Sequence, residues 1–369
     1  MQKNKLWIWQ HTNYPHFTYD TKVIETHLLE TSRIQGQLEG SIKHLSPDKQ
    51  HTFQTNTILD EILFTSYMEG EVLHRESVRS SLRKVFEDVN DHKGSKHTDN
   101  IASVQYDVNT NAKPLSLERL HRWHYELIVD GEYDATQVTP GAFRGYSEMY
   151  VTSGTGAKTR VHYAAPPSDV LDAQIEDFLV YCNSTTDNPL MQSAIAHIRF
   201  VQIHPYGDGN GRIARNITNY ILSKGMGLDS RYFSLSHAIN NDLENYGELL
   251  EQSNRLTKNP NLDLTLWIVW HTQIIHSAME MSINAIDKTI AKTKFYDKTR
   301  EIKISENQSK AISFLLSGKE ESINNSMYRA ITDTSQVTAS RQLNDLVKKG
   351  VLQKVANQKA RSSAYELCL

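Results

Sequence analysis

Apolar residues recur every three or four positions through most of the chain between residues 50 and 290. Clear examples are residues 117–128 and residues 264–275. Such spacing gathers apolar side chains on one face of an amphipathic helix, which then packs against other helices. Helices are also expected over residues 191–203 and 213–222, on both sides of a short polar loop. The middle of the chain therefore predicts an all-α core.

One stretch, from Val151 to Pro167, alternates instead. Apolar and polar residues alternate around the sequence Gly154-Thr155-Gly156, which predicts a two-stranded β-hairpin. The edge of such a hairpin can pair with an extended segment of another protein through backbone hydrogen bonds, although an ordinary surface hairpin is the alternative. The residues expected to dock the target are Thr159, Arg160, Val161, His162 and Tyr163.

Residues 301–369 differ in character from the rest of the chain. They hold ten Lys and Arg residues against seven Asp and Glu, whereas the whole chain has a net charge of −3. Helices are predicted over residues 310–316, 327–331 and 337–348, followed by a strand pair that ends at Tyr365. This order resembles a winged helix, an α+β domain expected over residues 300–369. The third helix would turn inward Ala339, Leu343, Leu346 and Val347.

In a winged helix the third helix can enter the major groove of DNA. It would present Ser340, Arg341 and Asn344 to the bases. The DNA phosphates would meet Lys348, Lys349, Lys354, Lys359 and Arg361. Winged helices also dock other proteins or form dimers, and the modest positive charge leaves DNA binding and protein contact equally open.

The loop between the helices at 191–203 and 213–222 concentrates the chemistry. It reads His204-Pro205-Tyr206-Gly207-Asp208-Gly209-Asn210-Gly211-Arg212 and is followed by Arg215. Backbone N–H groups at the start of a helix favour anions, and glycines let those groups approach a phosphate closely. The two arginines lie three residues apart and can face one polyphosphate. The loop is therefore predicted to bind phosphate, and because it contains no lysine it is not a Walker loop.

The sequence HPYGDGNGRIAR resembles the signature of the Fic family, HPFx(D/E)GN(G/K)RxxR, whose members mostly transfer AMP from ATP onto hydroxyl groups of proteins. Tyr206 stands where the family usually has Phe, so its hydroxyl needs a hydrogen-bond partner. The resemblance implies that His204 is the general base and that Asp208 holds Mg²⁺ against the α- and β-phosphates. It assigns the anion hole to Gly209, Asn210 and Gly211, and the β- and γ-phosphates to Arg212 and Arg215.

A second motif, Thr65-Ser66-Tyr67-Met68-Glu69-Gly70, resembles the inhibitory sequence (S/T)xxxE(G/N) of the same family. The inhibitory helix is expected over residues 55–70. Thr65 and Glu69 are four residues apart and share one helix face. The resemblance implies that Glu69 binds Arg215 in place of the ATP γ-phosphate, so that nucleotide binds in an unreactive pose. A solvated surface glutamate is the alternative when the motif is taken alone. The apolar face that would dock this helix comprises Ile58, Leu59, Ile62 and Leu63.

Later in the chain, Tyr246 and Asn254 resemble residues of a family segment near the adenine base. Residues of these types on a helix are more often at the edge of the core or on the surface. The expected set of ATP contacts is Glu69, Gly209, Asn210, Gly211, Arg212, Arg215, Tyr246 and Asn254.

Composition sets limits on domain number and location. The chain has 369 residues, 38% hydrophobic and 22% charged, which suits a soluble protein of two or three domains. No signal peptide or long apolar run is evident, so we expect a cytoplasmic protein without membrane contact. Cys182 and Cys368 provide neither a disulfide framework nor a metal cluster. The aromatic-rich residues 1–45 resemble a small domain that often precedes Fic cores, and the core itself is expected over residues 50–295.

The leading hypothesis is an autoinhibited protein adenylyltransferase that uses ATP with Mg²⁺ and modifies a Ser, Thr or Tyr hydroxyl of an unknown target protein, or of itself. A homodimer is a further expectation of the same hypothesis. One alternative is a DNA-binding regulator whose Fic domain senses nucleotide without turnover. Another is reversal of the reaction, in which Glu69 activates a water that removes AMP from the target. The presence of His204 favours the enzyme, because a site that only binds needs no general base.

Overall fold

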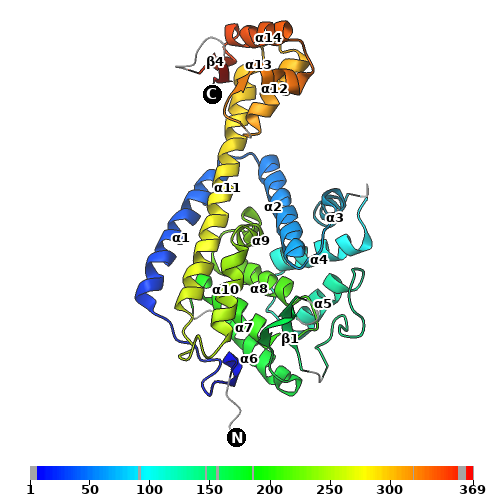
Figure 1. Ribbon diagram of the computed structural model, residues 1–369, viewed down its shortest axis with the longest axis vertical. Coiled ribbons are helices and arrows are strands. Elements are labelled where there is room, and N and C mark those ends of the chain that lie inside the picture. The colour runs from blue at the N-terminus through cyan, green and yellow to red at the C-terminus, as the bar shows by residue number, and fades with distance from the viewer. Residues whose placement is uncertain are drawn as a thin grey trace. The chain divides into compact units, whose positions relative to one another are not determined.

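Figure 1 shows the computed structural model of the chain, which describes residues 6–89, 93–145, 148–154, 158–184, 187–318, 320–355 and 363–368. Thr155 and Gly156 of the predicted turn, and Lys359 and Arg361 of the tail, lie outside the described residues. The chain divides into two compact units, Met1–Gly40 with Ser46–Ser282 and Ser41–Leu45 with Ile283–Leu369. The predicted limits at residues 45, 50, 295 and 300 stay predictions.

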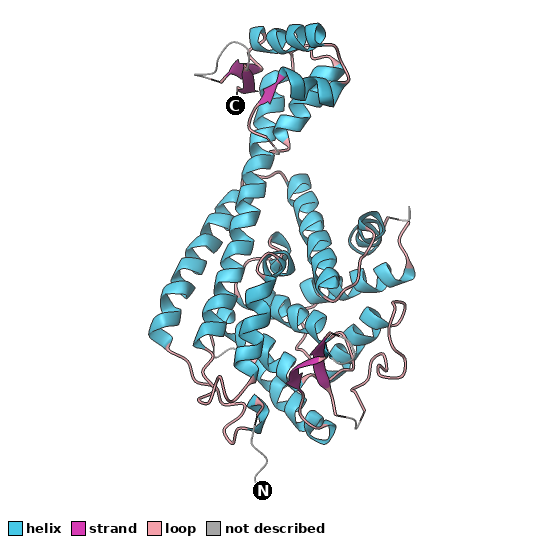
Figure 2. Cartoon of the chain, viewed as in Figure 1, coloured by secondary structure: helices cyan, strands magenta, loops and turns pink. Residues whose placement is uncertain are grey.

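The first unit is mostly helical in its described residues, with one small sheet (Figure 2). This agrees with the expected all-α core. Its longer helices are α1 (Thr21–Ile42), α2 (Pro47–Met68), α3 (Arg75–Glu87), α4 (Lys96–Thr110), α5 (Leu117–Ile128), α6 (Leu171–Asn183), α7 (Pro189–Ile203), α8 (Asn210–Gly225), α9 (Leu235–Asn240), α10 (Leu243–Asn254) and α11 (Thr265–Thr299). Only residues 21–40 of α1 and residues 265–282 of α11 belong to this unit. Short 3-10 turns are η1 (Ile8–Gln10), η3 (Ser168–Val170) and η4 (Ser230–Tyr232).

Two helices that frame the site, α5 and α7, start at residues suited to that position. Ser116 caps α5 by accepting a hydrogen bond from the backbone N–H of Arg119. Asn188 caps α7 in the same way, and Pro189 occupies the first helical position, where its missing N–H costs nothing. These caps fix where each helix begins.

The core of the first unit forms where α2, α4, α5, α7 and α8 meet. Its fully buried side chains include Leu59, Trp123, Phe200 and Ile217. Burial of each large side chain of this kind contributes about 1.5–3 kcal/mol. The same packing holds α7 against α8 and so fixes the two ends of the loop that joins them.

The predicted hairpin is present as β1 (Tyr150–Ser153) and β2 (Arg160–Ala164). The strands pair antiparallel, and their register shifts between Val151 and Thr152. We call the segment from β1 to β2 the flap. Its role in docking a target stays a prediction.

The second unit contains α12 (Glu306–Leu316), α13 (Asn325–Thr332) and α14 (Gln336–Lys348), where the sequence predicted three helices. A small antiparallel sheet has the strand order β3-β5-β4, with β3 at Ile323–Asn324, β4 at Leu352–Lys354 and β5 at Ala364–Leu367. Of the four residues expected inward on α14, Ala339, Leu343 and Leu346 are buried, and Val347 is half-buried. The short strand β3 was not predicted.

Candidate active site

The loop between α7 and α8 brings the signature residues together. His204 ends α7 with φ of 51°, a left-handed conformation that costs a residue with a side chain of order 1–3 kcal/mol. The guanidinium of Arg144 stabilises this turn, since its Nε donates to the carbonyl of His204 at 2.8 Å. The backbone N–H of Arg144 also donates to Pro205 at 2.9 Å. Arg144 is 7% exposed, so the contact lies inside the protein.

The glycines of the loop are required for two different reasons. Gly209 has φ of 76° and precedes the first residue of α8. Gly207 and Gly211 leave no room for a side chain, because a Cβ atom would lie 2.4 Å from the Gln137 carbonyl oxygen and 2.2 Å from Glu69 Oε1, respectively. Larger residues would therefore distort the loop.

Tyr206 and Asn210 stabilise the conformation of the loop through buried contacts. Tyr206 is fully buried, and its ring stacks on that of His124 with centroids 4.0 Å apart. The Tyr206 hydroxyl lies 3.1 Å from His121 Nδ1, which supplies the partner that the sequence required. The Asn210 side chain accepts from Tyr206 N at 3.0 Å and donates to Tyr206 O at 2.8 Å. Asn210 thus holds the loop closed, and its predicted phosphate contact stays a prediction.

The imidazole of His204 is arranged to act as a base. Its Nδ1 lies 3.2 Å from the carbonyl oxygen of Val201, which can only accept, so Nδ1 carries the proton and Nε2 is the basic nitrogen. Burial, with a smaller contribution from the nearby charge of Arg144, lowers the pKa of His204 to about 4. The ring is therefore neutral at physiological pH.

The first turn of α8 is the predicted anion-binding part of the loop, and Asp208 lies just before it. Backbone N–H groups at a helix start carry partial positive charge and favour phosphate. Asp208 leaves almost half of its side chain exposed, and its Oδ1 accepts from the N–H of Gly209 at 2.6 Å. The carboxylate thus stands at the loop surface beside the predicted phosphate position.

Arg215 lies in the contact that the inhibitory motif predicted. Its Nη2 donates to Glu69 Oε1 at 2.6 Å, and its Nε donates to Thr65 Oγ1 at 2.7 Å. Arg215 is 1% exposed. Burial acts to raise the pKa of Glu69, but the charge and the hydrogen bond of Arg215, together with the charge of Arg212, lower it below its usual value. Glu69 is the residue that ends α2, and Gly70 follows with φ of 82°.

Arg212, the other arginine of the signature, also has a carboxylate partner, which the sequence did not reveal. Glu71 Oε2 lies 3.1 Å from Arg212 Nη1, and Glu71 Oε1 lies 2.5 Å from His97 Nε2. Burial would raise the pKa of Glu71, yet the hydrogen bond from His97 and the charge of Arg212 lower it. Two carboxylates from residues 69–71 therefore hold both arginines of the signature. No local pattern signals the role of Glu71 or His97.

A further buried carboxylate, Glu61, fixes α2 in place. Its oxygens accept from Asn219 Nδ2 at 3.0 Å, from Ser234 Oγ at 2.7 Å and from Ser236 Oγ at 2.6 Å. Glu61 lies one helical turn before Thr65, so α2 presents a polar stripe to α8 along its buried face. This stripe was missed because a carboxylate within a helix usually faces solvent.

Tyr246 and Asn254, the two expected adenine contacts, are both buried on α10. Tyr246 is 8% exposed, donates or accepts at 3.1 Å with His197 Nε2, and stacks on Trp270 with centroids 5.5 Å apart. Asn254 is 4% exposed. Tyr246 belongs to an aromatic cluster with Trp267 and Trp270 of α11. The adenine contact of Tyr246 and Asn254 stays a prediction.

The predicted docking residues of the flap fall into three groups. Arg160 and His162 face Glu251 of α10, with Arg160 Nη2 at 2.5 Å and His162 Nδ1 at 3.6 Å from its Oε2. Tyr163 is 2% exposed and donates its hydroxyl to Gln202 O at 2.6 Å. Thr159 and Val161 are exposed.

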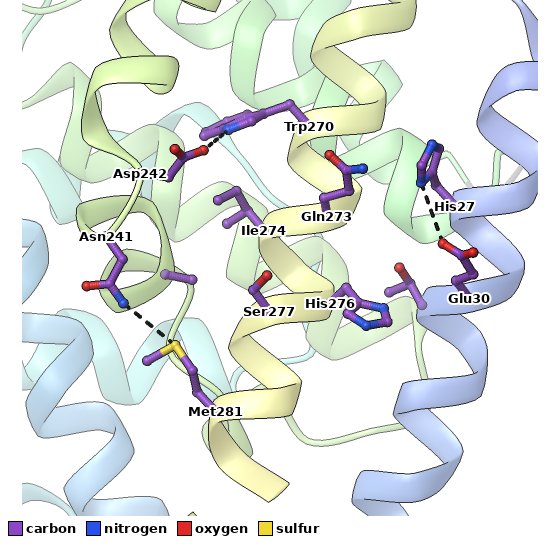
Figure 3. A pocket seen from close by; sticks show the side chains of 12 residues that line it. His27, Glu30, Asn241, Asp242, Trp270, Gln273, Ile274, His276, Ser277 and Met281 are labelled. Carbon is purple, nitrogen blue, oxygen red and sulfur yellow. Dashed lines mark hydrogen bonds and ion pairs between the residues drawn. The ribbon is translucent and has the colours of Figure 1, made fainter. Parts of the chain in front are cut away.

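Several cavities lie in the described part of the first unit, and two of them have quite different linings. One of about 530 Å³ is lined by Glu69, Glu71, His97, Asp208 and Arg212, so it adjoins the signature loop. The other, of about 490 Å³, lies between α1 and α11 (Figure 3). Figure 3 shows its lining side chains, and neither His204 nor the arginines are among them. The first cavity is therefore the candidate space for nucleotide.

Two family models match the chain. Residues 114–222 match the Fic/DOC family, and residues 7–87 match a domain of unknown function, DUF4172. Among curated proteins, the chain is similar to the protein adenylyltransferase Fic of Drosophila willistoni, with 31% identity over 112 residues. It is also similar to the protein adenylyltransferase fic-1 of Caenorhabditis elegans, with 39% identity over 113 residues. Each match covers 30% of this chain and only 19% and 18% of those proteins, respectively.

Solved structures share the fold at low identity. A Fic family protein from Desulfovibrio desulfuricans is 18% identical, with a TM-score of 0.56 over 96% of this chain and 98% of that one. Fic-1 of Caenorhabditis elegans is 19% identical, with a TM-score of 0.51 over 73% of this chain and 76% of that one. In the described part of the chain, no helix has both the length and the apolar content needed to cross a membrane.

Proposed function

We propose that the chain is an autoinhibited protein adenylyltransferase, which transfers AMP from ATP to a Ser, Thr or Tyr hydroxyl of a target protein and of the chain itself. The match of residues 114–222 to the Fic/DOC family supports this proposal. The observation that carries the proposal is the neutral imidazole of His204 next to the N-terminus of α8 and the arginine pair. A base, an anion site and two guanidiniums are what transfer of a nucleotidyl group requires.

In this reaction the target hydroxyl oxygen attacks the α-phosphorus of ATP. The new O–P bond forms as the bond from the α-phosphorus to the bridging oxygen breaks, and pyrophosphate leaves with that electron pair. His204 Nε2 takes the hydroxyl proton, while Val201 keeps the ring oriented through Nδ1. Backbone N–H groups at the start of α8 and the guanidiniums of Arg212 and Arg215 stabilise the negative charge.

The residues present fit Mg²⁺ bound together with the nucleotide. The described residues contain no cluster of three or more His, Cys, Asp or Glu able to hold a metal, and Mg²⁺ is commonly held by one or two carboxylates together with substrate phosphates and water. Asp208 offers one hard carboxylate at the loop surface, with almost half of its side chain exposed. When bound there, Mg²⁺ would neutralise charge on the α- and β-phosphates.

The inhibitory part of the proposal rests on the contact between Glu69 and Arg215. A carboxylate at 2.6 Å from Arg215 Nη2 takes the position that a γ-phosphate oxygen needs. ATP can then bind only with its phosphates displaced, and the α-phosphorus is not aligned with the incoming hydroxyl. Removal of AMP by a water that Glu69 activates is the alternative use of this carboxylate.

We propose a winged helix for the second unit, supported by three helices followed by strands and by the exposure of Ser340, Arg341 and Asn344 on α14. That surface could read DNA or dock a protein, including a second copy of the chain. The competing function, a DNA-binding regulator that senses nucleotide, draws its support from this unit alone.

The experiment that tests the proposal uses wild type, Glu69→Gly and Glu69→Gly/His204→Ala, each incubated with Mg²⁺ and α-labelled ATP. We expect label on the protein in the single variant, little in wild type and none in the double variant. Label absent from all three would refute the transferase and favour the regulator. Label in the double variant would refute His204 as the base.

A further inference from the structure

Residues 6–10, near the N-terminus, contact the flap, although the two segments are far apart in the sequence. The indole Nε1 of Trp9 donates to the carbonyl of Ala164 at 2.8 Å. The Trp7 ring meets that of Tyr163 edge to face, with centroids 5.6 Å apart. Trp7, Tyr163 and Ala165 form a small buried cluster of their own, separate from the main core.

Arg255, just after α10, completes this contact. Its guanidinium lies 4.9 Å from the centre of the Trp7 ring, and its Nη2 donates to the carbonyl of Val161 at 3.0 Å. The N–H of Leu256 donates to Leu6 O at 3.0 Å, and Trp7 and Arg255 form an isolated antiparallel bridge. Trp7 is thus enclosed between Arg255 and the flap.

Trp9 and Arg255 bind the backbone along one edge of β2. The other edge pairs with β1. Because the Ala165 N–H donates to Met149 O, the alternation of an antiparallel ladder turns the backbone groups of Ala164 away from β1. The carbonyls of Val161 and Ala164 are then satisfied by Arg255 and Trp9. The strand is held on both sides.

The same strand is also tied to the end of α7 that carries His204. The Tyr163 hydroxyl donates to Gln202 O at 2.6 Å. Arg144 donates both to the carbonyl of His204 and to that of Pro166, just after β2. The position of β2 relative to His204 therefore depends on side chains that touch Trp7 and Trp9.

We propose that Trp7 and Trp9 are positioning residues for the transfer reaction, since they hold β2 so that a hydroxyl presented by the flap meets His204 Nε2. This rests on the proposed function. A displacement of about 1 Å between reacting groups can lower a rate by roughly two orders of magnitude. A loosened strand would reduce attack by a held hydroxyl more than attack by a freely diffusing water.

The test places Trp9→Phe and Trp7→Leu in the Glu69→Gly background. Trp9→Phe keeps an aromatic ring and removes the Nε1 donor, so it isolates the bond to Ala164. Phe17→Leu is the matched control, because it changes an aromatic residue of the same N-terminal segment that has no ring contact with the flap in the described structure. Each protein is given Mg²⁺ and α-labelled ATP.

Three quantities are measured for each protein. They are the label on protein, the free AMP formed by attack of water, and the affinity for ATP. We expect both variants to lower the ratio of protein-bound AMP to free AMP about tenfold, with unchanged ATP affinity and an unchanged ratio in Phe17→Leu. A proportional fall of both products would indicate a general loss of structure and overturn the positioning role. An unchanged ratio would overturn it as well.

Amide hydrogen exchange separates this outcome from failure of the proposed function. In Trp9→Phe the amides of residues 160–165 should exchange faster, while those of α7 and α8 keep the parent rates. If Glu69→Gly transfers no AMP at all, the proposed function and the positioning role both fail, and the exchange data still decide whether Trp9 holds β2. Unchanged exchange in β2 would refute that mechanical role directly.

Discussion

The two sides of the α7–α8 loop are built in opposite ways. On the side of His204, the protein binds backbone carbonyls, through Arg144 to His204 and through Tyr163 to Gln202, and the basic nitrogen is left available. On the side of the arginines, carboxylates bind the guanidiniums that a triphosphate would need. Under the proposed function, the base is available while the nucleotide position is blocked. The contact between Glu69 and Arg215 would then control how ATP binds.

Removal of the proposed base should have the largest effect. In the Glu69→Gly background, His204→Ala should lower transfer by roughly 10²–10⁴-fold, the usual contribution of a general base. ATP affinity should change little, because His204 faces the incoming hydroxyl in the proposed reaction. Label incorporation and ATP titration measure the two effects. Equal loss of binding and transfer would show that His204 shapes the nucleotide site.

The pH dependence of transfer is the next test of the base. Burial lowers the pKa of His204 to about 4, compared with about 6.5 for a free imidazole. The neutral form is the active one, so Glu69→Gly should keep its activity as pH falls through 6.5 and lose it only as pH approaches 4. Initial rates between pH 4.5 and 8 check this. An acid limb near 6.5 would contradict the neutral, buried ring.

The free energy of unfolding should also decrease at acidic pH. The unfolded chain binds a proton on each histidine below about pH 6.5, whereas burial lowers the pKa of His124 to about 4 and that of His271 to about 3. The free energy of unfolding should therefore fall as pH drops from 6.5 toward 4 and level off above 6.5. Urea denaturation at pH 7 and pH 5 measures the difference, and equal values would contradict it.

The arginine side is tested first at Glu69. Glu69→Gly should raise transfer by about ten- to a hundredfold, since a hydrogen bond between charged groups contributes about 1.5–3 kcal/mol. Glu25→Gln, an exposed glutamate of α1, is a matched control and should leave the rate of wild type unchanged. A rise in affinity without a rise in rate would mean that Glu69 blocks binding but not the reactive pose.

Glu71 is predicted to have a weaker effect of the same sign. Its bond to Arg212 Nη1 is longer, at 3.1 Å, and its carboxylate is shared with His97. Glu71→Gln should raise transfer a few-fold, and the double variant with Glu69→Gly should exceed either single variant. Label incorporation by wild type, the two single variants and the double variant gives the coupling energy between Glu69 and Glu71. A rate below wild type would show that Glu71 orients Arg212 for catalysis.

The sequence was sufficient for contacts within one short segment. The spacing of His204, Asp208 and Arg212 predicted their convergence at a loop between two helices, and the structure places them there. The contact between Glu69 and Arg215 joins residues 146 positions apart. It was expected only through the family resemblance, because residue spacing gives no information about which helices become neighbours.

Contacts created by packing alone were not predictable. Glu71, His97 and Glu61 lie in stretches without any distinctive pattern, and they become important only because α2 packs against α8. The aromatic residues Trp7 and Trp9 were visible as a cluster, but their partners on β2 lie about 155 residues away. Long-range hydrogen bonds of this kind depend on the complete fold.

The smallest expected effect concerns Tyr206, the departure from the family signature. Tyr206→Phe removes only the hydroxyl that lies 3.1 Å from His121 Nδ1, and the ring keeps its stacking on His124. Loss of one neutral hydrogen bond should lower the free energy of unfolding by about 0.5–1.5 kcal/mol. Transfer by the Glu69→Gly protein should stay within twofold, because the loop shape depends on the backbone bonds between Tyr206 and Asn210. Denaturation and label incorporation measure the two quantities. A large loss of transfer without a loss of stability would show that the hydrogen bond between Tyr206 and His121 influences the reacting groups. The contrast between the prepared base and the blocked nucleotide position would then depend on the core beneath the loop as well.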